Sequence, residues 1–209
     1  PSTNFKNVAP ATQPVSNGAW LVRNSWGSSA GDSGYIWMSY EDKGLLASNA
    51  FVFDFDAASN YDNNYQYDGS YGNAEINVAA NGGVANVFTA HANPGGVEQL
   101  KAVSFFTYDQ TNINYNVSVY LMAADSTDPT SGTKVADLSG TQTYAGYHTI
   151  DLTSPVNLAK NQKFSVVLTL SKASSGAKML FEQNWTESGQ INSSSILAGQ
   201  SYLKNNYTN

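Results

Sequence analysis

The sequence predicts an all-β protein whose larger part is an antiparallel β-sandwich. Short runs rich in β-branched and aromatic residues recur from residue 75 onward, and clusters of Gly, Pro and Asn separate them. In the runs around Val117 and Val166 every second residue is apolar, so each run would bury one face. Two antiparallel sheets packed face to face produce this pattern. The predicted strands are 75–79, 84–90, 99–108, 115–123, 134–138, 146–152, 163–170 and 178–184.

Composition narrows the function classes. The 209 residues carry ten Lys and Arg against 16 Asp and Glu, which gives a formal net charge of -6. The basic residues are scattered, and this net charge repels a phosphate backbone, so we expect no nucleic-acid partner. The chain has no cysteine, which excludes disulfides, thiolate metal sites and a cysteine nucleophile within these residues.

Several motif classes are missing from the sequence. No stretch approaches about 18 consecutive apolar residues, so we expect no membrane span. We find no phosphate-binding loop and no zinc-protease motif, and we expect no metal and no cofactor. The first residue is Pro1 rather than Met, from which we expect a processed or truncated product of a longer protein.

Composition also changes along the chain. The N-terminal part opens with a proline-rich stretch and then holds apolar runs at 19–23 and 35–40, which we interpret as paired strands, and at 50–55, which we interpret as a buried strand. A tyrosine-rich segment with almost no aliphatic residue follows and forms a seam. The predicted division is an incomplete first domain at 1–55, the seam at 56–74 and the sandwich at 75–209.

One motif in the first domain points to a protein family. Residues 18–27 read GAWLVRNSWG, and GYIWM follows at 34–38. This arrangement resembles the region around the asparagine of papain-like (C1 family) cysteine peptidases, where a strand ends in Asn-Ser-Trp-Gly and Gly-Tyr opens the next strand. The family often repeats Trp-Gly four residues on, and Ala30-Gly31 stands there instead. The resemblance implies that residues 1–55 are the last strands of a papain-like domain.

The resemblance implies roles for two side chains. In such peptidases an asparagine oxygen accepts the ring N–H of the catalytic histidine and so orients the imidazole beside the cysteine thiolate. By match of motif, Asn24 is that orienting residue, and Trp26 shields the His–Asn pair from water. The family places Cys and His before the asparagine, so His91 and His148 cannot replace that histidine, and this chain alone should be inactive. The alternative is that Asn24 is a turn residue and Trp26 a core aromatic.

The second half resembles the lectin-like domain that follows the peptidase domain in a group of bacterial secreted or surface C1 peptidases. The matching segments are 61–69, 100–108, 146–152 and 162–167. The resemblance implies a jelly-roll or lectin-like sandwich and a secreted or cell-surface location.

Aromatic and acidic residues in the seam form a candidate ligand-binding site. Exposed aromatic rings stack on sugars, and Asn, Asp and Gln hydrogen-bond to sugar hydroxyls. The alternative is a linker that packs its tyrosines onto the sandwich. The candidate residues are Tyr61, Asp62, Tyr65, Tyr67 and Asp68.

Carboxylates near the seam also have the chemistry of calcium ligands, since calcium prefers oxygen donors. These are Asp54 and Asp56 together with Asp62 and Asp68. No EF-hand spacing connects them, so no metal site is predicted.

Three functional hypotheses follow from these observations. In the first, the chain is the C-terminal portion of a secreted or surface cysteine peptidase that cleaves a protein or peptide substrate, and the lectin-like domain positions it at a glycan or another cell-surface ligand. In the second, the sandwich is a carbohydrate-binding or adhesin module attached to a degenerate peptidase. In the third, the sandwich only packs on the peptidase domain and stabilises it.

Overall fold

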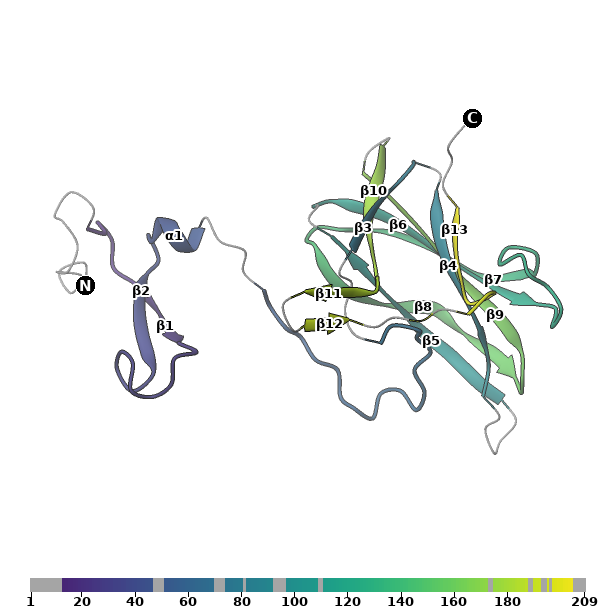
Figure 1. Cartoon of the computed structure of the whole chain (residues 1–209), viewed down its shortest axis with the longest axis horizontal. Helices are drawn as coiled ribbons and strands as arrows, with labels where there is room; N and C mark the ends of the chain where they lie inside the picture. The colour runs from purple at the N-terminus through teal and green to yellow at the C-terminus, as the bar shows by residue number, and fades with distance from the viewer. Residues whose placement is uncertain are drawn as a thin grey trace. The chain divides into compact units, whose positions relative to one another are not determined.

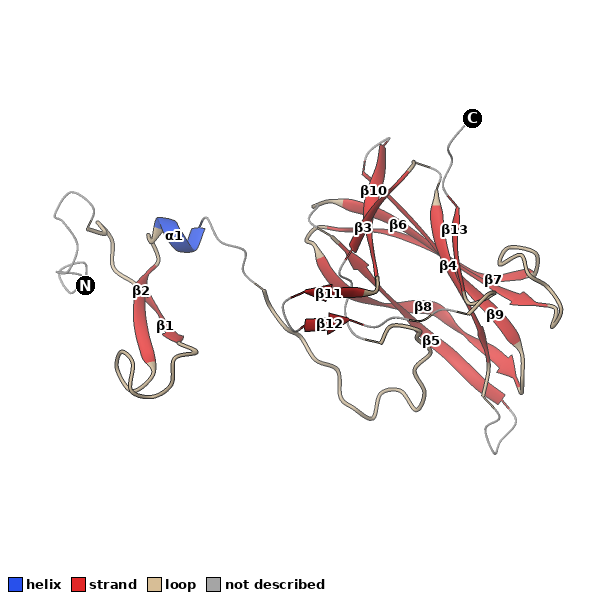
Figure 2. Cartoon of the chain, in the orientation of Figure 1, coloured by secondary structure: helices blue, strands red, loops and turns tan. Residues whose placement is uncertain are grey.

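The computed structural model describes residues 13–46, 51–69, 74–80, 82–91, 97–108, 111–172, 175–187, 190–192, 195 and 197–204. The chain divides into two compact units, one ending at Asp62 and one beginning at Asn63. Every strand pair in the described residues is antiparallel. Figure 2 shows strands and loops almost throughout. The predicted all-β class is confirmed.

The first unit is built on one hairpin. Strand β1 (Ala19–Arg23) pairs with β2 (Tyr35–Ser39), and a single helical turn, α1 (Lys43–Leu46), follows. The register places Ala19 opposite Ser39 and Arg23 opposite Tyr35. The two runs predicted to pair are therefore the strands of this hairpin. No helix in the described part of the chain is long and apolar enough to cross a membrane.

The prediction of a buried strand at 50–55 is wrong for the described residues 51–55. They are irregular, and Phe51, Val52, Phe53 and Phe55 are between 76% and 93% exposed. These residues have high strand propensity, but propensity takes effect only where a neighbouring strand supplies hydrogen bonds and a packing surface. The described part of the chain places no strand beside them.

The second unit contains the remaining strands (Figure 1). All eight predicted strands are present, with ends that differ by up to seven residues, and three short C-terminal strands were not predicted. The strands of the second unit are β3 (Ala74–Val78), β4 (Gly83–Thr89), β5 (Val97–Thr107), β6 (Ile113–Met122), β7 (Thr133–Gln142), β8 (Gly146–Ala159), β9 (Lys163–Lys172), β10 (Ser175–Phe181), β11 (Trp185–Glu187), β12 (Gln190–Asn192) and β13 (Ser201–Lys204).

The strands of this unit form two layers. In one layer β13, β4, β9, β6 and β7 lie side by side, so that β9 has β4 on one edge and β6 on the other. Strand β10 pairs with the end of β9 and with β3. The long ribbon of β5 and β8 belongs to the other layer, with a register shift between Leu100 and Ala102.

The core lies between the layers. Val117, Val119 and Phe164 of the larger sheet are fully buried and belong to the same cluster as Phe105 and Leu158 of the β5–β8 ribbon. Each such side chain contributes about 1.5–3 kcal/mol when it leaves water. The core therefore fixes which face of β6 and β9 points inward, and the residues at alternate positions point away from the core.

Candidate functional site

Asn24 lies at the end of β1, and three hydrogen bonds hold it. Its backbone N–H donates to the Gly34 carbonyl at 2.9 Å. Its side-chain Nδ2 donates to the Ala30 carbonyl at 3.3 Å, and its Oδ1 accepts the Trp26 N–H at 2.8 Å. The carboxamide is half-buried and has one orientation that satisfies both side-chain bonds.

The glycine-rich loop between β1 and β2 brings these partners together. Asp32 and Tyr35 exchange two backbone hydrogen bonds, at 2.8 and 2.9 Å, and close a tight turn. Gly31 has φ +64°, and a Cβ atom there would lie 2.3 Å from the Tyr35 carbonyl oxygen. A glycine is therefore required at this position for the loop to return to Asn24.

The same loop contains the pattern Gly-Xaa-Ser-Xaa-Gly at 27–31. In hydrolases that pattern marks a nucleophile only where a strand turns into a helix. Here it connects two strands of a hairpin. Ser29 is thus a loop residue and has no geometry of a nucleophile elbow.

The side-chain oxygen of Asn24 can accept one further hydrogen bond. A carbonyl oxygen has two lone pairs, and Trp26 uses one of them. The second can accept an N–H from another group, and the fixed carboxamide would hold that group in one orientation. The Trp26 side chain is 80% exposed beside it. Both histidines of the chain, His91 and His148, belong to the second unit.

Tyr65 of the candidate ligand site packs against the sandwich core. Its hydroxyl donates to Glu98 and accepts the His91 N–H at 2.7 Å. Its ring stacks on the His91 ring at 4.9 Å and meets Phe164 edge-on at 5.3 Å. Burial and the hydrogen bond to Glu98 raise the pKa of Tyr65 to about 12.

Glu98 connects the start of the second unit to β5. It is only 9% exposed, and it also accepts a hydrogen bond from the Asn63 amide. Because a buried carboxylate needs donors, Asn63 and Tyr65 compensate its loss of water. The segment that begins at Asn63 is thereby attached to the sandwich rather than free of it.

The other candidate ligand residues do not form one open surface. The Tyr67 ring stacks on Phe88 at 4.9 Å, and its hydroxyl donates to the Val87 carbonyl. Burial, with a smaller effect of the Glu182 charge, raises the pKa of Asp68. Tyr61 and Asp62 are exposed residues at the end of the first unit.

Metal-binding clusters are not found among the described residues. No three His, Cys, Asp or Glu side chains there are placed to hold an ion. Asp54 and Asp56 are exposed in the irregular segment of the first unit. The His148 ring shares a hydrogen bond with the Thr107 hydroxyl at 2.8 Å, and burial lowers the pKa of His148.

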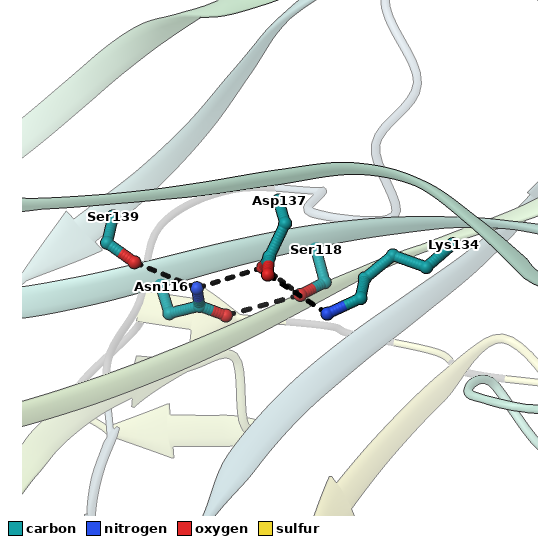
Figure 3. A network of polar contacts seen from close by, with 5 residues as sticks. All are labelled: Asn116, Ser118, Lys134, Asp137 and Ser139. Carbon is teal, nitrogen blue, oxygen red and sulfur yellow. Dashed lines mark hydrogen bonds and ion pairs between the residues drawn. The ribbon is translucent and has the colours of Figure 1, made fainter.

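A polar network that the sequence analysis did not select covers the outer face of β6 and β7 (Figure 3). Asp137 accepts hydrogen bonds from Lys134 at 2.9 Å, from Asn116 at 3.0 Å and from Ser118 at 2.8 Å. These donors, Lys134 first, lower the pKa of Asp137 to about 2. The alternation of Asn and Ser with buried apolar residues along β6 is the sequence signal that could have revealed it.

Comparison with known proteins finds a matching family for each of the two parts of the chain. The model of the lectin-like domain family matches residues 64–209, which is more than half of the chain. The chain belongs to the lectin-like domain family. The papain family cysteine protease model matches residues 11–53, the segment that contains the Asn24 hairpin. A papain-family fragment therefore precedes the lectin-like domain. Among curated proteins, none matches this chain.

Two solved structures share this combination of domains. One is the clostridial cysteine protease Cwp84 after propeptide cleavage, with 28% identity and a TM-score of 0.61 over 99% of this chain. The other comprises the cysteine protease and lectin-like domains of Cwp84, a surface layer associated protein of Clostridium difficile, with 28% identity and a TM-score of 0.62 over 98% of this chain. The chain spans 49% and 43% of those two structures.

Proposed function

We propose that this chain is the C-terminal portion of a papain-like cysteine peptidase in which Asn24 orients the catalytic histidine. The observation that carries the proposal is the fixed carboxamide of Asn24, which keeps one acceptor position on Oδ1. The match of the papain family to residues 11–53 supports it, because that match spans the Asn24 hairpin.

The proposed chemistry is hydrolysis of a peptide bond by an upstream Cys and His. The cysteine thiolate attacks the carbonyl carbon, and the imidazolium gives its proton to the departing amine. Water then attacks the thioester, with the imidazole as base, and releases the acid and the thiol. Asn24 takes no proton in these steps. It accepts the other ring N–H, so the imidazole remains in the tautomer and orientation that both steps need.

Trp26 is the proposed shield of that hydrogen bond. Its ring is large, and it follows Asn24 by two residues in the turn that the Asn24 side chain itself closes. An indole ring over the His–Asn pair would exclude water, and a hydrogen bond in such surroundings is stronger. The exposed state of the ring in this chain is consistent with a surface that the catalytic histidine would complete.

The lectin-like domain is the proposed accessory unit that holds the enzyme at a glycan or another cell-surface ligand. The resemblance to a surface layer associated protease supports a secreted or cell-surface location. The protein or peptide substrate is read by the peptidase domain and the cell-surface ligand by the sandwich.

The test compares this chain with a protein that carries a whole papain-family domain ahead of it. The longer protein should hydrolyse a fluorogenic peptide and should be labelled by a cysteine-directed epoxide. The present chain should do neither, because it has no cysteine. Turnover by the present chain, or a longer protein that is folded but unreactive toward the epoxide, would refute the peptidase proposal.

A further inference from the structure

The outer face of β7, β6 and β9 presents two rows of small polar side chains. Val117 and Val119 of β6 are fully buried in the core, so alternate residues of β6 point away from it. The register brings the rows into line across the three strands. One row is Thr141, Asn114 and Ser171, and the other is Ser139, Asn116 and Thr169.

These six residues, together with Tyr115 and Gly140, line a hollow of about 400 Å³. That volume lies within the range of pockets that bind small molecules, which is roughly 300–1,000 Å³. Neighbouring strands are about 4.8 Å apart, so each row extends roughly 10 Å across the sheet. The hollow is open on one side and therefore suits part of an extended chain.

Hydrogen bonds fix one side of the hollow before any ligand arrives. Asn116 donates to Ser139 at 2.9 Å and to Asp137 at 3.0 Å, and Asp137 is itself held by Lys134 (Figure 3). Thr141 donates to the Asn114 oxygen at 2.7 Å. Polar groups that are already oriented lose little conformational entropy on binding.

Other groups in the hollow keep hydrogen-bonding capacity. Ser139 accepts a bond from Asn116, so its own O–H is still available to donate. Thr169 and Ser171 make no side-chain hydrogen bond within the described part of the chain, and the Asn114 amide N–H groups have no partner there. The hollow thus offers donors and acceptors on all three strands.

The chemistry of the lining selects the class of ligand. None of the six side chains is charged, and Lys134 of the adjoining network is paired with Asp137 at 2.9 Å. An anionic polymer would meet a chain of net charge -6 without a free cation at this site. An apolar ligand would desolvate hydroxyls and amides without compensation. We propose that this hollow, defined by the six residues above, binds a neutral oligosaccharide across β7, β6 and β9.

This inference rests on the accessory role in the proposed function and gives that role a site. It differs from the tyrosine-rich seam, where the Tyr65 and Tyr67 rings pack on the core. A competing surface is the exposed pair Phe106 and Tyr147 on the outer face of the β5–β8 ribbon. Their rings are 4.8 Å apart but inclined by 56°, so they form no flat platform for a sugar ring.

The test is an NMR titration of the full 209-residue chain with maltotetraose, mannotetraose and chitotetraose, each added separately, and with tetragalacturonate as the charged comparison. We expect backbone amide shifts confined to β6, β7 and β9 with at least one neutral tetrasaccharide. The variant Thr169→Val with Ser171→Ala removes two hydroxyls that make no hydrogen bond within the described residues, and it should raise the Kd at least about fivefold. The matched variant Thr149→Val with Ser104→Ala removes the same groups from the β5–β8 ribbon and should leave the Kd unchanged.

Each other outcome contradicts the inference in a distinguishable way. Shifts centred on Phe106 and Tyr147 would refute this hollow but keep an accessory binding role. Binding of tetragalacturonate alone would refute the neutral ligand class. An absence of shifts with every sugar at about 10 mM would refute both the hollow and the accessory glycan role. None of these outcomes alters the peptide hydrolysis assay, which tests the peptidase proposal by itself.

Discussion

The side-chain oxygen of Asn24 accepts the backbone N–H of Trp26 at 2.8 Å. This bond makes the two roles proposed for the motif depend on one another, since the residue that would orient an imidazole also places the indole that would cover it. The donation from Asn24 to Ala30 at 3.3 Å sets the plane of the carboxamide. The same two hydrogen bonds of the Asn24 side chain therefore close the turn and hold the carboxamide in the orientation that the proposed catalytic role needs.

The loop that supports Asn24 should depend on the glycine at position 31. Gly31→Ala would place a Cβ atom 2.3 Å from the Tyr35 oxygen, whereas Gly27→Ala meets no atom within 4 Å although both glycines have positive φ. We expect Gly31→Ala to speed hydrogen exchange of the Asn24 amide, which bonds to Gly34, at least tenfold more than Gly27→Ala does. Equal exchange in the two variants would show that the loop does not need this close approach.

Strand β10 should tolerate no side chain at Gly176. A Cβ atom there would lie 1.5 Å from the Val78 carbonyl oxygen, so Gly176→Ala must separate β10 from β3. We expect a loss of about 1–3 kcal/mol in the free energy of unfolding, measured by urea denaturation. Gly69→Ala is the matched control, because the nearest atom to its Cβ would be 3.8 Å away. A loss of similar size in both variants would contradict the assigned pairing.

The attachment of Tyr65 should appear as a sensitivity to alkaline pH. The pKa of Tyr65 is raised to about 12, mainly by burial and then by Glu98, whereas an unfolded tyrosine ionises near 10. A raised pKa stabilises the folded state below pH 10, and this contribution is lost as the pH rises from 10 to 12. Tyr65→Phe should therefore flatten the fall in unfolding free energy over that window. An equally steep fall in the variant would show that Tyr65 is not buried against Glu98.

Asp137 should make the sandwich sensitive to acid. Its pKa is lowered to about 2, first by Lys134 and then by Asn116 and Ser118, and an unfolded aspartate titrates near 4. A lowered pKa contributes stability above pH 4, and the contribution is lost as the pH falls from 4 to 2. Asp137→Asn should be less stable at neutral pH and should lose less on acidification. Asp125→Asn, which removes an exposed carboxylate of the loop after β6, serves as the charge control.

Local patterns explain which parts of the fold could be predicted from the sequence. The strands of the sandwich and the Asn24 hairpin follow from alternation and turn residues, which are visible within a few positions. The segment 51–55 has the same local signal but no paired neighbour in the described chain, so propensity alone misled the interpretation.

Long-range pairing explains what could not be predicted. The hollow depends on the register that sets Asn116 opposite both Ser139 and Thr169, and the pairing of β6 with β9 joins strands far apart in the sequence. Likewise, the sequence shows that the seam is rich in tyrosines, but it does not show which way their rings point. Their partners Glu98 and Phe88 lie on strands whose position relative to Tyr65 and Tyr67 is set by the whole sandwich.

The most direct measurement of the central claim is the turnover of Asn24 variants in a protein that carries the whole papain-family domain. Asn24→Ala should lower kcat by about 100-fold, since the imidazole loses its orienting acceptor, and should shift the acidic limb of the pH–rate profile. Asn24→Asp keeps an oxygen for the Trp26 N–H and for the ring N–H, and it should retain more of the turnover. Unchanged kcat and an unchanged pH profile in a folded Asn24→Ala protein would show that Asn24 only forms the turn.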